Sequence, residues 1–494
     1  MMLIPGTNLH TSIFTALVKR EFQQLAPRTV VDLCPSPPHD AIATRVNETL
    51  TLEVAAEDYE QSGLSPFNRT FVGWLHDALP RTDPNDRWSS PEEAERTLSA
   101  TFDRMLRPTV LWQDPTSDAA LSRFVTQGLG AHMLEAHRIG ASERGYVVDL
   151  AFMEKYATRP GFQRYGAVLH LSPALEPTRI DRAGRRVAPG QDGWEEAKLV
   201  FRASVAAAAT VRDHAVRCHM IVANAAVVAT RRSLPPEHPI RRLLMPFQFR
   251  TPTINWDALL LLVGERAIFH RLFAFEWSGL RQVYDDAKNS YRMETIPAEL
   301  TRRGVADLPG YAYGEDALDY WAEIRRFVEA YVGLYFTRAA CPDEDLIRWW
   351  HDLRHVSLDV MPLENRDDLV DLCTYFIFMA TGFHAQVGGT LADYLSHLGL
   401  GPPTVCEGRS YEEMLPSKNT MFQAHMLGAL TNLRMPQILE DFSWLMLDVE
   451  ARAAVAELRA RLGELSRRIA RKNRERAQPM TTFDPRYLDL SVSI

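Results

Sequence analysis

The longest helical pattern of the chain lies near its middle. Residues 194–230 contain no Gly or Pro and are rich in Ala, and apolar side chains cover most of the helical circumference. This pattern predicts a helix roughly 55 Å long, at about 1.5 Å per residue. Because such a helix has almost no polar face, we expect it at the buried centre of the protein. The same periodicity predicts further helices at about 255–275, 315–337, 343–355, 366–398, 419–442 and 448–475.

The sequence before this helix is less regular. Prolines cluster near position 36, and 81–88 reads as a polar loop. The best strand candidates are 146–153 and 166–171, and a loop is expected at 184–193. We therefore expect a mainly α fold with minor β-strands, in which one large helical domain surrounds the long central helix. Residues 1–110 would form an irregular or helical N-terminal section of that domain, and 111–494 its catalytic core.

Composition narrows the class of protein. The chain has 494 residues, of which 46% are hydrophobic and 24% charged, and its formal net charge is −8. An acidic balance argues against a nucleic-acid partner, and five scattered Cys residues without a CxxC pair argue against a disulfide framework or a thiolate zinc site. No stretch approaches the ~18 apolar residues of a membrane span. With no signal-peptide pattern either, we expect a cytoplasmic protein with at most peripheral membrane contact.

Two histidines of the central helix have a spacing that only a distorted helix could use. His214 and His219 are five positions apart, which leaves their rings about 140° apart on an ideal α-helix. They could share one ion only where the helix is distorted, as in a π-bulge. Otherwise they are hydrogen-bonded histidines of a helical core. A third histidine, His384, lies in another apolar helical segment, and three neutral imidazoles suit iron, zinc or copper.

Two other histidine pairs also have spacings that bear on metal binding. His132 and His137 have the same five-residue spacing, and we expect them on a surface or cavity-lining helix. His351 and His355 stand four residues apart and could bind zinc by geometry. No third ligand is evident near them, so a solvated helix face is the expectation.

The ordered motifs of the C-terminal three-fifths of the chain resemble those of the lipoxygenase family. The tail 491–494 is similar to that family's terminal NS-[IV]-S-I, with Leu490 in place of the Asn. We expect a compact form without the N-terminal lipid-binding β-sandwich that some members carry. The other matching positions are Trp194, Ala197, Lys198, His214, His219, 238–240, 243–244, Pro246, 253–255, 300–305, 316–336, 349–350, His384, Ala385 and Val387.

The resemblance implies a non-haem iron site. In lipoxygenases two histidines at this spacing, a third histidine and the carboxylate of the last residue bind the iron, which maps to His214, His219, His384 and Ile494. The family's further ligand, an Asn, is replaced by Gly388, and Gln386 would face away from the site on a regular helix. The resemblance also places Ala258, Leu262 and Phe269 in the substrate pocket, with Ala258 where Ala or Gly steers the stereochemistry.

The implied reaction is hydrogen abstraction from a doubly allylic CH2 of a polyunsaturated fatty acid or similar lipid, followed by addition of O2 to give a hydroperoxide. An alternative is an enzyme of the same fold with altered chemistry, such as hydroperoxide rearrangement or oxidation of another unsaturated small molecule. A further alternative is a relative that binds a lipid without turnover. The four intact ligand positions argue against that last possibility, because a decaying site should lose its ligands first.

Overall fold

The fold surrounds one long helical rod. A computed structural model describes residues 41–45, 51–55, 84–85, 87–90, 92–94, 96, 114–139, 143–258, 262–337, 341–356, 359–389, 391–395, 398–431 and 436–492. Most of 1–110 lies outside these residues, so the division at position 110 and the expected lack of a β-sandwich stay predictions. The expected fold class, mainly α with minor strands around a central helix, is confirmed.

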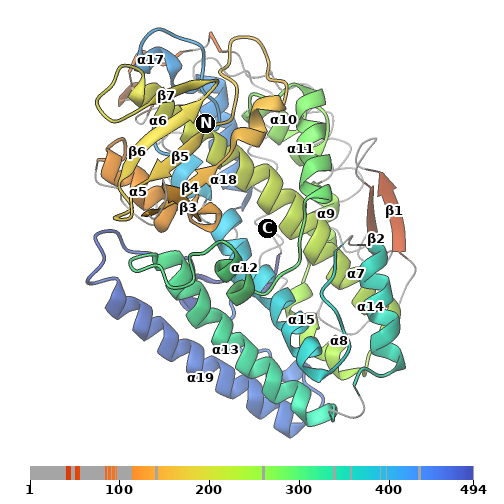
Figure 1. Cartoon of the computed structure of the whole chain (residues 1–494). Coiled ribbons are helices and arrows are strands. Elements are labelled where there is room, and N and C mark those ends of the chain that lie inside the picture. The colour runs from red at the N-terminus through yellow and green to blue at the C-terminus, as the bar shows by residue number, and fades with distance from the viewer. Residues whose placement is uncertain are drawn as a thin grey trace.

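The rod has three consecutive parts, which Figure 1 shows crossing the middle of the molecule. These are α6 (Trp194–Ala207), the π-helix η4 (Ala208–Ala223) and α7 (Asn224–Ser233). Gly193 precedes the rod in the left-handed conformation, with φ of 84°, which a residue without a Cβ adopts without strain. Nearly every side chain of α6 and η4 is buried, as the apolar pattern predicts.

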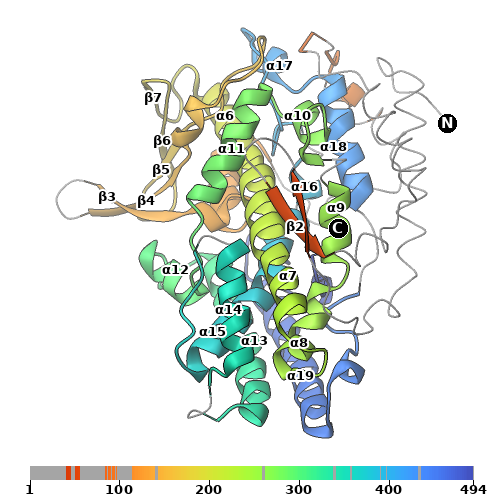
Figure 2. The same ribbon diagram turned by 90° about the vertical axis from the view of Figure 1, so that its right-hand side faces the viewer.

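Helices surround the rod on several sides (Figures 1 and 2). The long pair α13 (Ala312–Tyr335) and α19 (Val449–Lys472) packs side by side, and α13 also packs against α15 (Arg366–Phe378). The other α-helices are α5 (Asp118–Thr126), α8 (Pro239–Leu244), α9 (Thr251–Ala258), α10 (Ile268–Leu272), α11 (Trp277–Asn289), α12 (Ile296–Arg302), α14 (Glu344–Val356), α16 (Leu391–Leu395), α17 (Tyr411–Met414) and α18 (Lys418–Thr431).

An antiparallel sheet lies beside the first part of the rod. Its five strands follow one another in sequence order: β3 (Glu135–Ile139), β4 (Glu143–Asp149), β5 (Val168–Leu171), β6 (Pro177–Arg182) and β7 (Arg185–Val187). The two predicted strands correspond to β4 and β5, and the loop expected at 184–193 is present except that β7 takes up Arg185–Val187. A separate hairpin pairs β1 (Ala41–Arg45) with β2 (Thr51–Ala55). None of the described helices is both long and apolar enough to cross a membrane.

Three predicted helices are wrong in extent or type. The one at 255–275 is two short helices, α9 and α10, separated by a turn where Arg266 has a φ of 65°. The helix expected to reach 442 is described as far as Thr431, and the described chain is no longer α-helical from Pro436, which lacks the N–H that a longer helix would need. The helix expected around His132 and His137 is a short 3-10 turn followed by β3, because that strand pairs with β4.

Candidate metal centre

The π-helix brings His214 and His219 to one side of the rod. In a π-helix the backbone bonds run from residue i to i+5, so two residues five apart lie one above the other. The Nε2 atoms of the two rings are 3.0 Å apart, although the same spacing would separate them on a regular α-helix. The distortion on which the shared site depends is therefore present.

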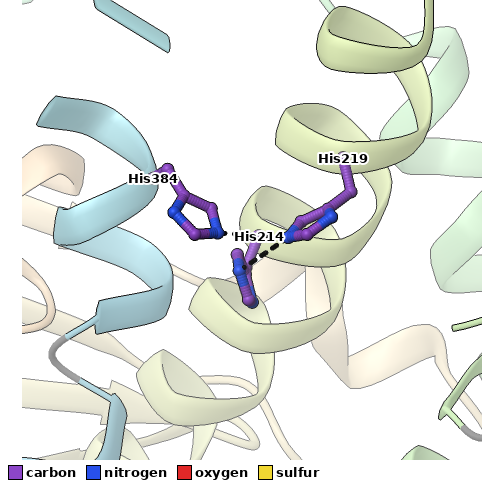
Figure 3. Close-up of side chains that lie close together, drawn as sticks. All are labelled: His214, His219 and His384. Carbon is purple, nitrogen blue, oxygen red and sulfur yellow. Dashed lines mark hydrogen bonds between the residues drawn. The ribbon is translucent and has the colours of Figure 1, made fainter. Parts of the chain in front are cut away.

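The third ring comes from a second distorted helix. His384 lies between the π-helical segments η8 (Met379–Phe383) and η9 (Ala385–Gly389), which continue α15 and pack against η4. Its Nε2 is 3.2 Å from that of His219. Figure 3 shows the three rings pointing toward one another from the two helices. Among the described residues, these three form the one cluster of His, Cys, Asp or Glu side chains arranged to hold a metal ion.

The spacing of the three nitrogens fits a metal better than a chance contact. Two nitrogens bound about 2.1 Å from one ion at roughly right angles would be about 3.0 Å apart, close to the distances found. Nitrogen lone pairs directed at one point repel one another unless a proton or a cation lies between them. Neutral imidazole donors are compatible with iron, so the donor set fits the metal that the sequence resemblance implies.

Asn255 fixes which nitrogen of His219 faces the other rings. Its Oδ1 is 3.0 Å from His219 Nδ1, and its Nδ2 donates to the backbone oxygen of His219 at 3.1 Å. Because Oδ1 can only accept, Nδ1 carries the proton and Nε2 keeps a free lone pair. Such a partner orients a metal-binding imidazole. The sequence motif 253–255 contained this residue, but nothing in the sequence alone revealed its partner.

Burial keeps the central rings neutral. Burial, together with the neighbouring His219 and His384, holds the pKa of His214 well below its usual 6.5. Burial also lowers the pKa of His219 to about 4, although its hydrogen bond to Asn255 acts in the opposite direction. Imidazole must be neutral to bind a metal, so these two side chains are in the binding form at neutral pH.

Ile494 lies outside the described residues, so its role as a ligand stays a prediction. Hydrogen bonds attach the segment before it, 488–491, to neighbouring parts of the chain. Ile438 and Leu490 donate backbone bonds across a short antiparallel pairing between 436–438 and 488–490, at 3.0 and 2.7 Å. Ser491 then donates to the backbone oxygen of Phe249 at 2.9 Å, and Val492 is completely buried. Residues 490–492 therefore lie in the protein interior.

Gly388, at the position of the family's further ligand, and the neighbouring Gln386 both lie in η9. Gln386 is buried, and its Nε2 donates to the backbone oxygen of Gly128 at 2.9 Å, so its side-chain amide is engaged away from the rings, as predicted. Gly388 lies directly against His214. A Cβ at position 388 would be 2.4 Å from His214 Nε2.

The three predicted pocket residues lie on or after α9. Ala258 is buried and stands one turn beyond Asn255 on that helix, hence on the same side. Leu262 is partly buried against the core, and Phe269 is fully buried in α10, where its ring packs against Phe273. A pocket role for the three stays a prediction.

An ionic cluster around a buried carboxylate adjoins the centre, and no sequence motif predicted it. Asp213, next to His214, accepts from Arg212 Nε and Nη2, both at 2.8 Å, and from Arg217 Nη1 at 3.1 Å. His132 Nε2 is 3.0 Å from the same carboxylate, so this histidine is a buried partner of Asp213. His351 and His355 are exposed on α14, as expected for a solvated face.

Comparisons with known proteins find similarity to lipoxygenases. Residues 183–420 match the family model described as lipoxygenase. The chain is 28% identical over 329 residues to polyunsaturated fatty acid lipoxygenase ALOX15 of Pongo abelii, covering 61% of this chain and 49% of that protein. It is also 28% identical over 301 residues to human hydroperoxide isomerase ALOXE3, covering 56% of this chain and 42% of that protein.

A solved structure shows the same fold. The fold matches that of a lipoxygenase variant crystallised anaerobically in complex with arachidonate, with a TM-score of 0.75 and 16% sequence identity, over 98% of this chain and 82% of that chain. The chain spans about half the length of the curated relatives it matches, 49% in the case of the Pongo abelii protein.

Proposed function

This chain belongs to the lipoxygenase family, and from that premise we propose that it is a non-haem iron dioxygenase of polyunsaturated fatty acids or similar lipids. Its product would be a lipid hydroperoxide formed with O2. The observation that carries the proposal is the convergence of His214, His219 and His384, with Nε2 atoms 3.0 and 3.2 Å apart in the protein interior.

The proposed ligands are these three imidazoles and the terminal carboxylate of Ile494. A metal held there would supply the reversible one-electron redox chemistry that removal of a hydrogen atom from a doubly allylic CH2 requires. Neutral imidazoles with a single carboxylate suit such a redox role because they are compatible with both iron oxidation states.

The chain's own residues would serve three purposes in this reaction. Asn255 holds the proton of His219 on Nδ1 and so keeps Nε2 available. The apolar packing around η4 and η8 keeps the centre out of bulk solvent. Ala258, one turn from Asn255, would border the reacting part of the lipid, together with Leu262 and Phe269.

Oxygen uptake with a matched pair of lipids tests this proposal. Linoleate has a doubly allylic CH2, whereas oleate has the same chain length and carboxylate but lacks that group. We expect the iron-loaded protein to consume O2 with linoleate, producing conjugated-diene absorbance, and to leave oleate unchanged. Iron-loaded protein that consumes no O2 with linoleate, arachidonate or any other doubly allylic lipid would refute the dioxygenase assignment.

A second candidate is rearrangement of a lipid hydroperoxide. Two observations favour it: Gly388 offers no side-chain ligand, and one relative is named a hydroperoxide isomerase. Such an enzyme would convert a linoleate hydroperoxide to an isomer, with both oxygen atoms retained and no O2 consumed. Loss of the added hydroperoxide in a sealed cell at constant O2 would identify this reaction in place of the first.

A further inference from the structure

One short segment of the chain contacts both helices that carry the three histidines. Residues 128–134 join α5 to β3 (Figure 1), and the 3-10 turn η2 (Ala131–Met133) forms their middle. His132 lies in this turn and is only 7% exposed. A buried polar side chain needs partners inside the protein, and the partners of His132 lie on η4 and η8. The segment therefore lies where it can set the distance between these two helices.

The His132 ring contacts the residue directly before each of two proposed ligands. Its Nε2 is 3.0 Å from Oδ2 of Asp213, which precedes His214. Because a carboxylate oxygen only accepts, Nε2 carries the proton of this bond. The same ring meets that of Phe383, which precedes His384, with the centroids 5.7 Å apart and the ring planes at 90°. Such a T-shaped pair has a preferred geometry, so one side chain links η4 to η8 beside two of the three ligands.

The backbone of the same segment contacts the chain on the other side of His384. Gln386, two residues after that histidine, donates through Nε2 to the backbone oxygen of Gly128 at 2.9 Å and to that of Leu129 at 3.4 Å. Together with the contact at Phe383, these bonds place the segment on both sides of one proposed ligand. Contacts on both sides restrict how the helix can shift or turn around that ligand.

The segment is itself anchored in the core. Tyr311 donates through Oη to the backbone oxygen of Ala131 at 2.6 Å. Arg303 donates through Nη1 to the backbone oxygen of Leu134 at 2.7 Å and to Tyr311 Oη at 3.1 Å. Both of these side chains are buried. A side chain can hold its neighbours in place only when its own position is fixed by packing and hydrogen bonds, and His132 meets that condition.

The two histidine-bearing helices need such support. Before an ion binds, nitrogens that each direct a lone pair at one point repel one another, so the surrounding chain has to hold the rings at the distances found. A direct bond between the helices runs from Cys218 Sγ of η4 to the backbone oxygen of Met379 in η8, at 3.4 Å. A thiol is a weak donor, and this bond adds little to the restraint.

We propose that His132 is a positioning residue of the metal centre, which ties η4 to η8 and so keeps His214 and His384 at the spacing that one ion requires. This inference rests on the proposed function in one respect, because it assumes that a metal binds at the three histidines. It adds a third element, residues 128–134, to the two helices that carry the imidazoles, although that segment provides no ligand.

Cobalt(II) binding to the metal-free protein tests the proposal, because the visible absorption of this ion depends on the number and arrangement of its ligands. His132→Phe keeps a ring against Phe383 but loses the bond to Asp213. That carboxylate retains Arg212 and Arg217 as partners, so we expect the variant to fold. Its cobalt affinity should fall about tenfold, the lower end of the usual cost of losing a partner that orients a ligand, and its absorption spectrum should change.

His132→Gln tests the bond by restoring it. A Gln side chain carries its amide N–H about as far from the backbone as His carries Nε2–H, so this variant should recover most of the affinity and the wild-type spectrum. Phe383→Leu removes the ring contact from the side of η8 and should lower cobalt affinity at least about threefold. It tests the proposal even if His132→Phe does not fold.

His238→Phe is the matched control for loss of a buried histidine. His238 is buried at the start of α8, where its Nδ1 accepts from the backbone N–H of Ile240 at 3.2 Å and its ring lies 6.0 Å from that of Phe336. We expect this variant to bind cobalt within about twofold of wild type, because distant sites act independently, and to keep the wild-type spectrum.

Three outcomes would overturn the proposal. These are unchanged cobalt affinity and spectrum in His132→Phe, unchanged affinity in Phe383→Leu, or an equal loss in His238→Phe, which would indicate general destabilisation. A wild-type protein that binds neither cobalt nor iron would contradict both this proposal and the proposed function. Variants that behave as expected in a protein that consumes no O2 with any lipid would contradict only the proposed function.

Discussion

At the scale of single residues, the arrangement of the three imidazoles also depends on the side-chain amide of Asn255. Asn255 links α9 to η4 twice, through the Nδ1 proton of His219 and through its backbone oxygen. The sequence identified the histidines from their spacing and from the family motifs. The Asn255 contact depends on how α9 packs against η4, and a single sequence does not contain that information.

Replacing Asn255 should weaken the metal site without removing a ligand. We expect Asn255→Leu to lower metal affinity by about 10- to 100-fold, the usual cost of losing a partner that orients a ligand. Asn255→Asp keeps an acceptor for the Nδ1 proton and should recover most of that loss. Isothermal titration of the metal-free variants would measure both. Equal affinities for wild type and Asn255→Leu would show that the amide does not position His219.

Asp213 makes a second prediction at this scale. Burial by itself would raise the pKa of this carboxyl, but Arg212, His132 and Arg217 hold it well below its usual range. Asp213→Ala would leave two partly buried guanidinium groups without their shared buried partner, which should lower the free energy of unfolding by about 3 kcal/mol. Asp192→Ala, at an exposed position before α6, should change it by less than about 0.5 kcal/mol. Chemical denaturation of both variants measures the difference.

At the scale of elements, the histidine spacing was the most informative sequence signal. It predicted that a shared site requires a distorted helix, and η4 supplies that distortion. The breaks in the other helices were harder to foresee. Arg266 adopts a positive φ, a conformation that few residues other than Gly adopt. The residue type at this position therefore does not predict that α9 and α10 are separate helices.

The C-terminal segment carries a pH-dependent element. Burial raises the pKa of Asp489 from 3.8 to about 7. A carboxyl whose pKa is higher in the folded state contributes full stability below its unfolded pKa, and that contribution is lost as the pH rises through the folded value. Relative to wild type, Asp489→Asn should therefore be similarly stable near pH 4 and increasingly more stable as the pH rises to about 7. Melting temperatures of both proteins across this range would test it, and a difference independent of pH would contradict it.

At the scale of the whole molecule, the sequence predicted the helical architecture and two strands of the sheet, β4 and β5, but not the other three. β3 to β7 are short, and only two of them show a clear apolar pattern; the rest depend on pairing with neighbouring strands. Basic residues at and beyond the end of α19 also serve tertiary packing, because Lys472 and Arg476 pair with the buried Asp316 of α13, at 3.0 and 2.6 Å.

The most direct test of the whole account is the iron content of the purified protein, measured by elemental analysis per chain. We predict about one iron in the wild type, almost none in His219→Ala, and an undiminished amount in His351→Ala, whose ring is exposed on α14. Iron retained at the wild-type level in His219→Ala would contradict the claim that the three converging imidazoles form the metal centre.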